Sequence, residues 1–238
     1  MNRSHFSVID VKGVTSRRKR HRAEVFAAAI LLACAALASC ARPAPAVEVP
    51  AAQAAAPAPF KDETAVAPPS AEEEELNRRP LKLPLKNPRV VVRKAARRVE
   101  LFSGGERVRL FRAALGFAPE GDKERQGDGR TPEGDFYVCM KNGRSNFYLS
   151  LGLNYPDAAD AARALRERLI TRAQHDRIVR ANREGRCPPW DTKLGGEIFI
   201  HGGGSASDWT LGCVALENQH VKELFDHLPT GTPVRIEP

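Results

Sequence analysis

Residues 198–216 read IFIHGGGSASDWTLGCVAL. The short apolar run that ends at His201 is typical of a buried strand, and the glycines after it allow a tight backbone turn. Cys213 follows His201 by 12 positions, a distance that a glycine loop and a return strand would close. Backbone N–H groups in such glycine turns are free to stabilise a negatively charged oxygen. The stretch therefore predicts two strands that place an imidazole beside a thiol.

This pair of side chains fits nucleophilic catalysis, because a thiol attacks as its thiolate and a nearby histidine can take the proton. Three other interpretations stay open at this point. The two residues also fit a core histidine and a buried free cysteine, which is common. They fit a zinc site completed by Cys187, although the short paired spacing of zinc ligands is missing. The glycines could cradle a phosphate, but no lysine follows them.

Short segments rich in β-branched and aromatic residues lie throughout the second half of the chain. Strands are predicted at residues 90–92, 99–102, 107–115, 135–140, 146–151, 197–201 and 233–237. Turns are predicted at residues 103–106 and 141–143, where Gly, Asn and Ser gather. Many short strands at this spacing favour a sandwich or barrel over a parallel sheet. The predicted fold class is therefore mainly β.

Two helical episodes interrupt the strands. Residues 157–182 carry apolar residues at helical spacing among many arginines, which predicts two helices broken near Ile170. These helices form an insertion over residues 157–185, expected either to cover or flank the site or only to pack against the domain. A C-terminal helix is predicted from the spacing of Val221, Leu224, Phe225 and Leu228. Three histidines in the helical segments are expected at the surface: His175, His220 and His227.

The N-terminal 39 residues are typical of a secretory signal. Residues 1–22 hold seven Lys and Arg, and residues 25–38 are uncharged and mostly Ala, Leu and Val. The apolar run is too short to span a bilayer comfortably, because spanning takes about 20 residues. A basic nucleic-acid tract followed by a buried helix is the alternative. Residues 37–40, LASC, resemble the bacterial lipobox, which implies lipidation of Cys40; ordinary cleavage nearby is the rival.

Charge and composition divide the rest of the chain. The net charge is +8 overall but only +3 from Cys40 onward, so the basicity indicates export and no nucleic-acid partner. Residues 40–86 are rich in Ala, Pro and Glu and predict a disordered tether. The acidic block 72–75 is expected to be solvated. A single catalytic domain is predicted over residues 87–238.

Three motifs in this order resemble the L,D-transpeptidase catalytic domain, the YkuD-like family. They are GDGRTPEGDFYV at residues 127–138, IFIHGGG at 198–204 and WTLGCVALEN at 209–218, closed by GTPVRI at 231–236. The opening hairpin also resembles that of the family, so the likeness covers residues 88–238. It implies a β-sandwich-like domain with a cysteine-based acyl-transfer site. The helical insertion and the C-terminal helix are additional elements of this domain.

The resemblance implies roles for individual residues. Cys213 would be the nucleophile and His201 the general base. The backbone at Gly202 or Gly203 would orient the imidazole. Thr210 stands where the family usually has Ser, and amides around Leu211, Gly212 and Cys213 would form the oxyanion hole.

This sequence departs from the commonest family motif at two positions. Leu211 replaces a second histidine, which should not abolish the chemistry because the base is assigned to His201. Ala215 replaces an Arg or Asn, which leaves the orientation of the substrate open. The motif thus resembles a subgroup ending in GCxAL, in which the acceptor is less obvious.

The implied function is peptidoglycan L,D-transpeptidation between stem peptides through a thioester on Cys213. Transfer to water, as in a carboxypeptidase or hydrolase, is the first alternative, and a non-catalytic wall-binding lipoprotein is another. No metal or organic cofactor is implied, and the sequence carries no signal for an oligomeric state. The expected location is the periplasm, with a lipid anchor in the outer or inner membrane. In that oxidising compartment Cys139 and Cys187 could form a disulfide, or both could be buried thiols.

Overall fold

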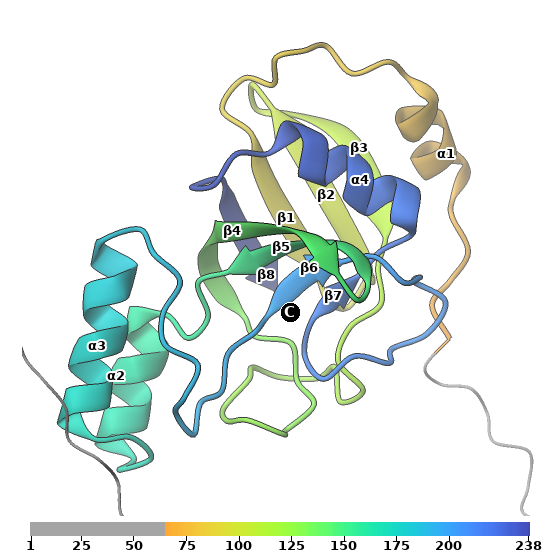
Figure 1. Cartoon of the computed structure of the whole chain (residues 1–238). Coiled ribbons are helices and arrows are strands. Elements are labelled where there is room, and N and C mark those ends of the chain that lie inside the picture. Colours follow the sequence, from red (N-terminus) through yellow and green to blue (C-terminus); the bar gives the residue numbers. More distant parts are fainter. Residues whose placement is uncertain (1–64) are drawn as a thin grey trace, which may run out of the picture. The chain divides into compact units, whose positions relative to one another are not determined.

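The computed structural model describes residues 65–238 (Figure 1). The helices of this part are α1 (Ala71–Arg78), α2 (Ala158–Arg166), α3 (Arg172–Arg183) and α4 (Asn218–His227). The strands are β1 (Arg89–Arg93), β2 (Arg98–Ser103), β3 (Glu106–Arg112), β4 (Gly134–Ser145), β5 (Tyr148–Leu153), β6 (Phe199–His201), β7 (Val214–Ala215) and β8 (Pro233–Glu237). The predicted mainly β class is confirmed. The predicted signal peptide, Cys40 and most of the predicted tether lie outside the described residues.

The eight strands form one curled sheet in the order β3-β2-β1-β8-β4-β5-β6-β7. The long strand β4 pairs with β8 along its first part and with β5 along its second, so it links the two halves of the sheet. Ala114, just after β3, forms a bridge with Ala215 in β7, which brings the two ends of the strand order together. The sandwich-like layers are thus parts of a single sheet that bends back on itself.

The main core lies inside this curl. Strand β8 alternates buried and exposed residues, as expected for a strand with one face in the core. Helix α4 buries Val221 and Leu224 against the sheet, and Leu228 follows at its end. Each such side chain contributes roughly 1.5–3 kcal/mol when it leaves water. The C-terminal helix therefore forms where its apolar spacing predicts, because that spacing faces the sheet.

The turn predicted at residues 141–143 is wrong. Strand β4 continues through these residues to Ser145, and the chain reverses between Ser145 and Tyr148. The ladder shifts register between Asn142 and Ser145, so the Asn-Gly pair is absorbed as an irregularity within the strand. The hydroxyl of Ser145 then accepts a hydrogen bond from the N–H of Phe147 and closes the turn. Pairing with β5 thus overrides the local turn preference.

The prediction of a disordered tether up to residue 86 is wrong for residues 65–86. Helix α1 forms here, with Ser70 as its N-cap and a reciprocal capping pair between Ser70 and Glu73. Glu73 is only 2% exposed, and its carboxylate lies 2.6 Å from Nε of Arg98 on β2. The acidic block is therefore partly buried in an ion pair.

Helix α1 also covers the edge strand β3. The side-chain amide of Asn77 donates to the carbonyl oxygen of Leu110 at 2.7 Å and accepts from its N–H at 3.1 Å. An edge strand otherwise presents unpaired backbone groups to water. Composition pointed to disorder because apolar residues are few here. The segment is ordered through polar bonds to an edge that exists only in the folded sheet.

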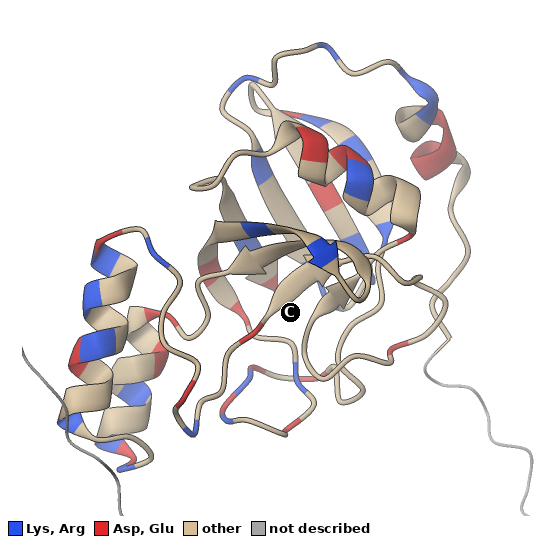
Figure 2. Cartoon of the chain, in the orientation of Figure 1, with Lys and Arg blue, Asp and Glu red and all other residues tan. Residues whose placement is uncertain are grey.

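The helical insertion forms α2 and α3, with Thr171 as the N-cap of α3, as the predicted break near Ile170 indicates. Its helices share a small apolar cluster separate from the main core: Ala161, Ala164, Ile170, Ile178 and Leu194. Arginines outnumber acidic residues on both helices (Figure 2). Within residues 65–238, no helix combines the length and apolar character needed to cross a bilayer.

Candidate active site

A pocket of about 680 Å³ opens on the side of the domain where β6 and β7 begin. Both Cys213 and His201 line it. Its other walls come from the loop before β4, from the tip of the β4–β5 hairpin, from residues 195–199 and from residues 209–211. Strands β6 and β7 are parallel neighbours, with Ile200 opposite Val214. This pairing brings together the two residues that the sequence places 12 positions apart.

Cys213 lies directly before β7 with a half-buried side chain. Its thiol donates to the carbonyl oxygen of Glu197 at 3.4 Å, and its Sγ accepts from the N–H of Phe199 at 3.4 Å. Burial raises the pKa of the Cys213 thiol to about 11; the Phe199 N–H and the charge of Lys123 act in the opposite direction. The resting side chain is therefore a neutral thiol at pH 7.

His201 ends β6 and is 3% exposed. Its Nδ1 lies 2.6 Å from the carbonyl oxygen of Gly202. Because a carbonyl oxygen only accepts, we assign the proton to Nδ1, which leaves Nε2 as the basic nitrogen. Phe147 stacks on the ring at 4.6 Å between centroids, and Trp209 meets it edge-on at 5.5 Å. Burial lowers the pKa of His201, and the bond to Gly202 partly offsets this effect.

The directions of both pKa shifts favour neutral side chains at rest. A thiolate beside a charged imidazole would require a low thiol pKa and a high imidazole pKa, and both shifts have the opposite sign. A neutral imidazole with a free Nε2 is suited to take the thiol proton as the sulfur attacks. The arrangement thus favours general-base activation over a preformed ion pair.

The residues predicted to shape the site each make different hydrogen bonds. Gly202, rather than Gly203, contacts the His201 ring, since the N–H of Gly203 binds the side chain of Asn218 at 3.0 Å. Thr210 holds the turn before the cysteine: its hydroxyl donates to the carbonyl oxygen of Cys213 at 2.7 Å and accepts from the N–H of Gly212 at 3.1 Å. The N–H of Gly212 is therefore already bound to the Thr210 hydroxyl and is not free for an oxyanion.

The remaining predicted amides stay available. Among residues 65–238, no hydrogen bond uses the backbone N–H of Leu211 or Cys213. Leu211 is strongly exposed at the mouth of the pocket. Gly212 has φ of +131°, and a Cβ there would lie 2.6 Å from the carbonyl oxygen of Arg130. The turn before Cys213 thus requires glycine, and within the described residues it leaves the amides of Leu211 and Cys213 unpaired.

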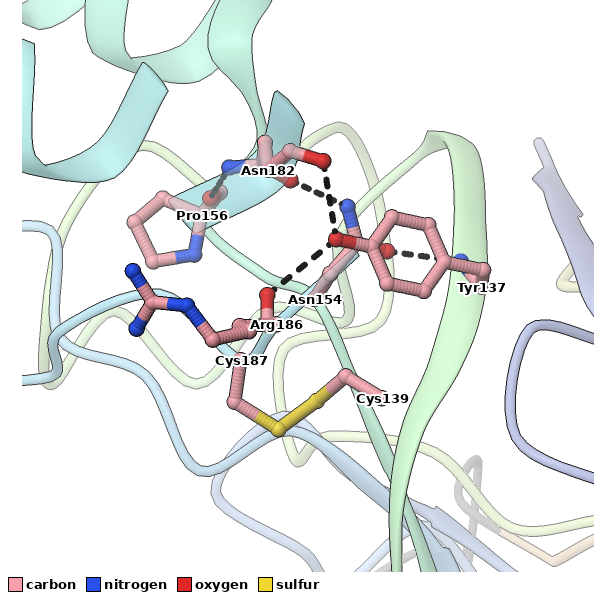
Figure 3. The surroundings of a disulfide bond; sticks show 7 residues. All are labelled: Tyr137, Cys139, Asn154, Pro156, Asn182, Arg186 and Cys187. Carbon is pink, nitrogen blue, oxygen red and sulfur yellow. Dashed lines mark hydrogen bonds between the residues drawn. A yellow bond between two sulfur atoms is a disulfide. The ribbon is translucent and has the colours of Figure 1, made fainter. Parts of the chain in front are cut away.

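Cys139 on β4 and Cys187 after α3 form a disulfide (Figure 3). The zinc alternative therefore fails, because Cys187 has no thiolate to offer. Among the described residues, no group of three or more His, Cys, Asp or Glu side chains is placed to hold a metal ion.

Next to the disulfide, the hydroxyl of Tyr137 donates to the carbonyl oxygens of Asn182 and Arg186, which ties the end of α3 to β4.

The helices α2 and α3 do not line the pocket; the segment that follows them does. Trp190 packs so closely on Gly196 that a Cβ on this glycine would lie 2.0 Å from the indole. Trp190 also meets Phe199 edge-on at 6.0 Å between centroids. The insertion and its disulfide thus anchor the wall formed by residues 195–197 rather than covering the site.

Several pocket residues were missed by the sequence analysis: Lys123, Phe147, Glu197 and Trp209. Trp209 stands four positions before Cys213, which was the one signal available. The prediction that His220 lies on the surface is wrong, because its ring stacks on Phe111 at 4.5 Å between centroids and is half-buried.

Comparisons with known proteins gave one family match and several similar solved structures. The profile of the L,D-transpeptidase catalytic domain, YkuD, matches residues 87–236. An L,D-transpeptidase structure from Xylanimonas cellulosilytica is 21% identical, with a TM-score of 0.39 over 72% of this chain and 71% of that one. An L,D-transpeptidase from Mycobacterium smegmatis is 13% identical, with a TM-score of 0.38 over 64% and 59%. A protein of Bdellovibrio bacteriovorus is 21% identical, with a TM-score of 0.41 over 64% and 48%.

This chain therefore spans less than two thirds of the length of the last two structures. A search of curated protein sequences gave no match. The family profile covers well over half of the chain and includes both His201 and Cys213. The chain belongs to the YkuD family of L,D-transpeptidase catalytic domains.

Proposed function

We propose that this protein is a peptidoglycan L,D-transpeptidase with Cys213 as its nucleophile and His201 as its general base. The observation that carries the proposal is the shared pocket of the two side chains, in which the Gly202 carbonyl leaves Nε2 of His201 as the base. The donor is a stem peptide in which a residue of L configuration precedes a residue of D configuration. No metal or organic cofactor is needed, because thiol, imidazole and amides suffice.

The first half of the reaction forms a thioester. Nε2 of His201 takes the proton of Cys213 while the sulfur attacks the donor carbonyl carbon. The free N–H groups of Leu211 and Cys213 stabilise the resulting oxyanion. The carbon–nitrogen bond breaks, and the proton on His201 passes to the departing amine. An acceptor then resolves the thioester and forms the product.

The test compares the protein with Cys213→Ala on purified disaccharide-tetrapeptides. Cross-linked dimers that disappear in the variant support transfer, and shortened peptides that disappear support hydrolysis. Binding to sacculi without any turnover would instead identify a non-catalytic wall-binding protein. A covalent mass increase on Cys213 with a carbapenem, absent in the variant, reports the reactive thiol independently.

For location, we propose export to the periplasm with a lipid anchor at Cys40. The support is the LASC sequence at residues 37–40, after a basic segment and a short apolar run. Several acyl chains are needed for stable anchoring, because a single chain binds membranes only marginally. Globomycin sensitivity, with a Cys40→Ala variant that leaves the membrane fraction, is the expected result. Unchanged partition of that variant would refute the anchor.

A further inference from the structure

Glu197 occupies an unusual place in the pocket. It directly precedes Ile198 and β6, and its backbone has φ of +54°, a left-handed conformation that non-glycine residues adopt at a cost. Its carbonyl oxygen accepts the thiol proton of Cys213. The residue is thus adjacent to the reactive sulfur, and its exposed side chain lines the same pocket.

The carboxylate of Glu197 has no partner in the protein. Among residues 65–238, no ion pair or hydrogen bond involves its side-chain oxygens, whereas nearby Asp128 accepts from Lys123 and three backbone N–H groups. A negative charge beside Cys213 also opposes formation of the thiolate and raises the thiol pKa. Activation of the thiol therefore does not explain this carboxylate, which is available for a cationic group of a ligand.

Two cationic side chains line the same pocket. Lys123 lines the pocket and is 3% exposed. Its Nζ donates one of its three N–H groups to the carboxylate of Asp128, at 2.6 Å. Arg144 lies at the tip of the β4–β5 hairpin and forms no ion pair within the described residues. The pocket thus offers one free negative group and at least one fixed positive group next to the nucleophile.

The negative Glu197 and the positive Lys123 are complementary to the free end of an amino acid, in which one carbon carries both an ammonium and a carboxylate. We propose that Glu197 binds the ammonium of such an acceptor, that Lys123 binds its carboxylate, and that an amine rather than water resolves the thioester on Cys213. The inference rests on the function proposed above and specifies its acceptor.

In the second half-reaction, the acceptor amine displaces the sulfur of Cys213 from the thioester. The acceptor ammonium gives one proton to the Glu197 carboxylate and becomes a free amine. Its nitrogen attacks the thioester carbon, and Nε2 of His201 takes a second proton from that nitrogen. The carbon–sulfur bond breaks, the sulfur of Cys213 recovers the proton from His201, and Glu197 returns its proton to solvent. The products are a new amide and the free thiol.

The experiment measures how the thioester divides between an amine and water. The full chain is incubated with disaccharide-tetrapeptide and a free D-amino acid, and the exchanged peptide and the hydrolysed tripeptide are quantified. In Glu197→Gln we expect the ratio of exchange to hydrolysis to fall about tenfold or more, since a charged partner is lost. The rate of thioester formation, followed by mass spectrometry, should stay within about twofold. Glu106→Gln, at the exposed first residue of β3, is the matched control and should leave both values unchanged.

A second comparison tests Lys123. The protein should prefer the D-amino acid over its amide, which lacks the carboxylate, and Lys123→Met should lose this preference while it still forms the thioester. An unchanged exchange-to-hydrolysis ratio in Glu197→Gln would overturn the inference. Loss of thioester formation in that variant would overturn it too, because Glu197 would then act in the first half-reaction. Absence of any thioester in the unaltered protein would refute the proposed function instead.

Discussion

The backbone N–H of Val66 donates a hydrogen bond to the carbonyl oxygen of Ala206 at 2.9 Å. The guanidinium of Arg112 binds the carbonyl oxygens of both residues. Ala206 lies in the loop that runs from His201 to Cys213. The segment before α1 is thereby joined to the loop that carries the candidate active site, and the end of the predicted tether is part of the folded domain.

Replacement of Arg112 by Met should loosen this junction while it keeps the apolar stem. We expect the free energy of unfolding to fall by about 1–3 kcal/mol, because two carbonyl groups lose a charged donor. Hydrogen exchange of residues 202–209 should become faster. Arg166→Met, on helix α2, is the control and should change neither quantity. Unchanged exchange in the loop would show that the junction does not hold it.

Replacement of Asn77 by Ala should expose the edge of β3. Both backbone groups of Leu110 lose their partner, so we expect a loss of about 1–3 kcal/mol in urea denaturation. Glu75→Ala removes only an exposed ion pair of the same helix and should cost less than about 1 kcal/mol. Equal effects of the two variants would contradict the role assigned to Asn77.

The disulfide between Cys139 and Cys187 closes a loop with a sequence separation of 48. The chain-entropy estimate for a loop of this length is about 4 kcal/mol, and replacing both cysteines by Ser should cost about 2–4 kcal/mol. Thiol titration of the denatured, unreduced chain from Ala41 onward should find one thiol, Cys213. Three thiols would exclude the bridge.

The pH dependence of thioester formation follows from His201. Only the neutral imidazole accepts a proton, and burial lowers the pKa of His201 below 6.5. The neutral form therefore persists as the pH falls below 6.5, and the acylation rate should stay on its plateau there and drop only at lower pH. Stopped-flow acylation by a carbapenem measures this profile. A rate that declines from pH 7.5 downward would indicate a raised pKa and a preformed ion pair.

Replacement of Gly212 by Ala should affect activity more than stability. A Cβ would meet the carbonyl oxygen of Arg130 at 2.6 Å, so the turn that presents the amides of Leu211 and Cys213 must shift. We expect acylation to slow by about 10²-fold or more, as for loss of an oxyanion donor. Gly185→Ala is the control: it also has positive φ but open space around it, and should leave acylation unchanged.

The strands and the principal site residues could be predicted from the sequence because their signals are local. Alternation and β-branched runs mark the strands, and His201 and Cys213 stand in a short glycine-rich unit. The two strands of this unit pair in parallel, however, and not as the strand and return strand that the sequence predicts. The apolar spacing of α4 and the break at Thr171 are equally local. The family motifs added the order of these pieces, which periodicity alone does not supply.

Other features depend on contacts between distant segments, and only the tertiary structure decided them. Residues 65–86 are ordered because β3 offers an edge to Asn77 and β2 offers Arg98 to Glu73. The Asn142-Gly143 pair remains in a strand because β5 pairs with it. Glu197 and Lys123 meet in one pocket although 74 positions separate them. The sequence by itself determined which residues carry the chemistry, since that depends on residue type and short spacing. The fold decided what surrounds the thiol, because partners and burial arise only from packing.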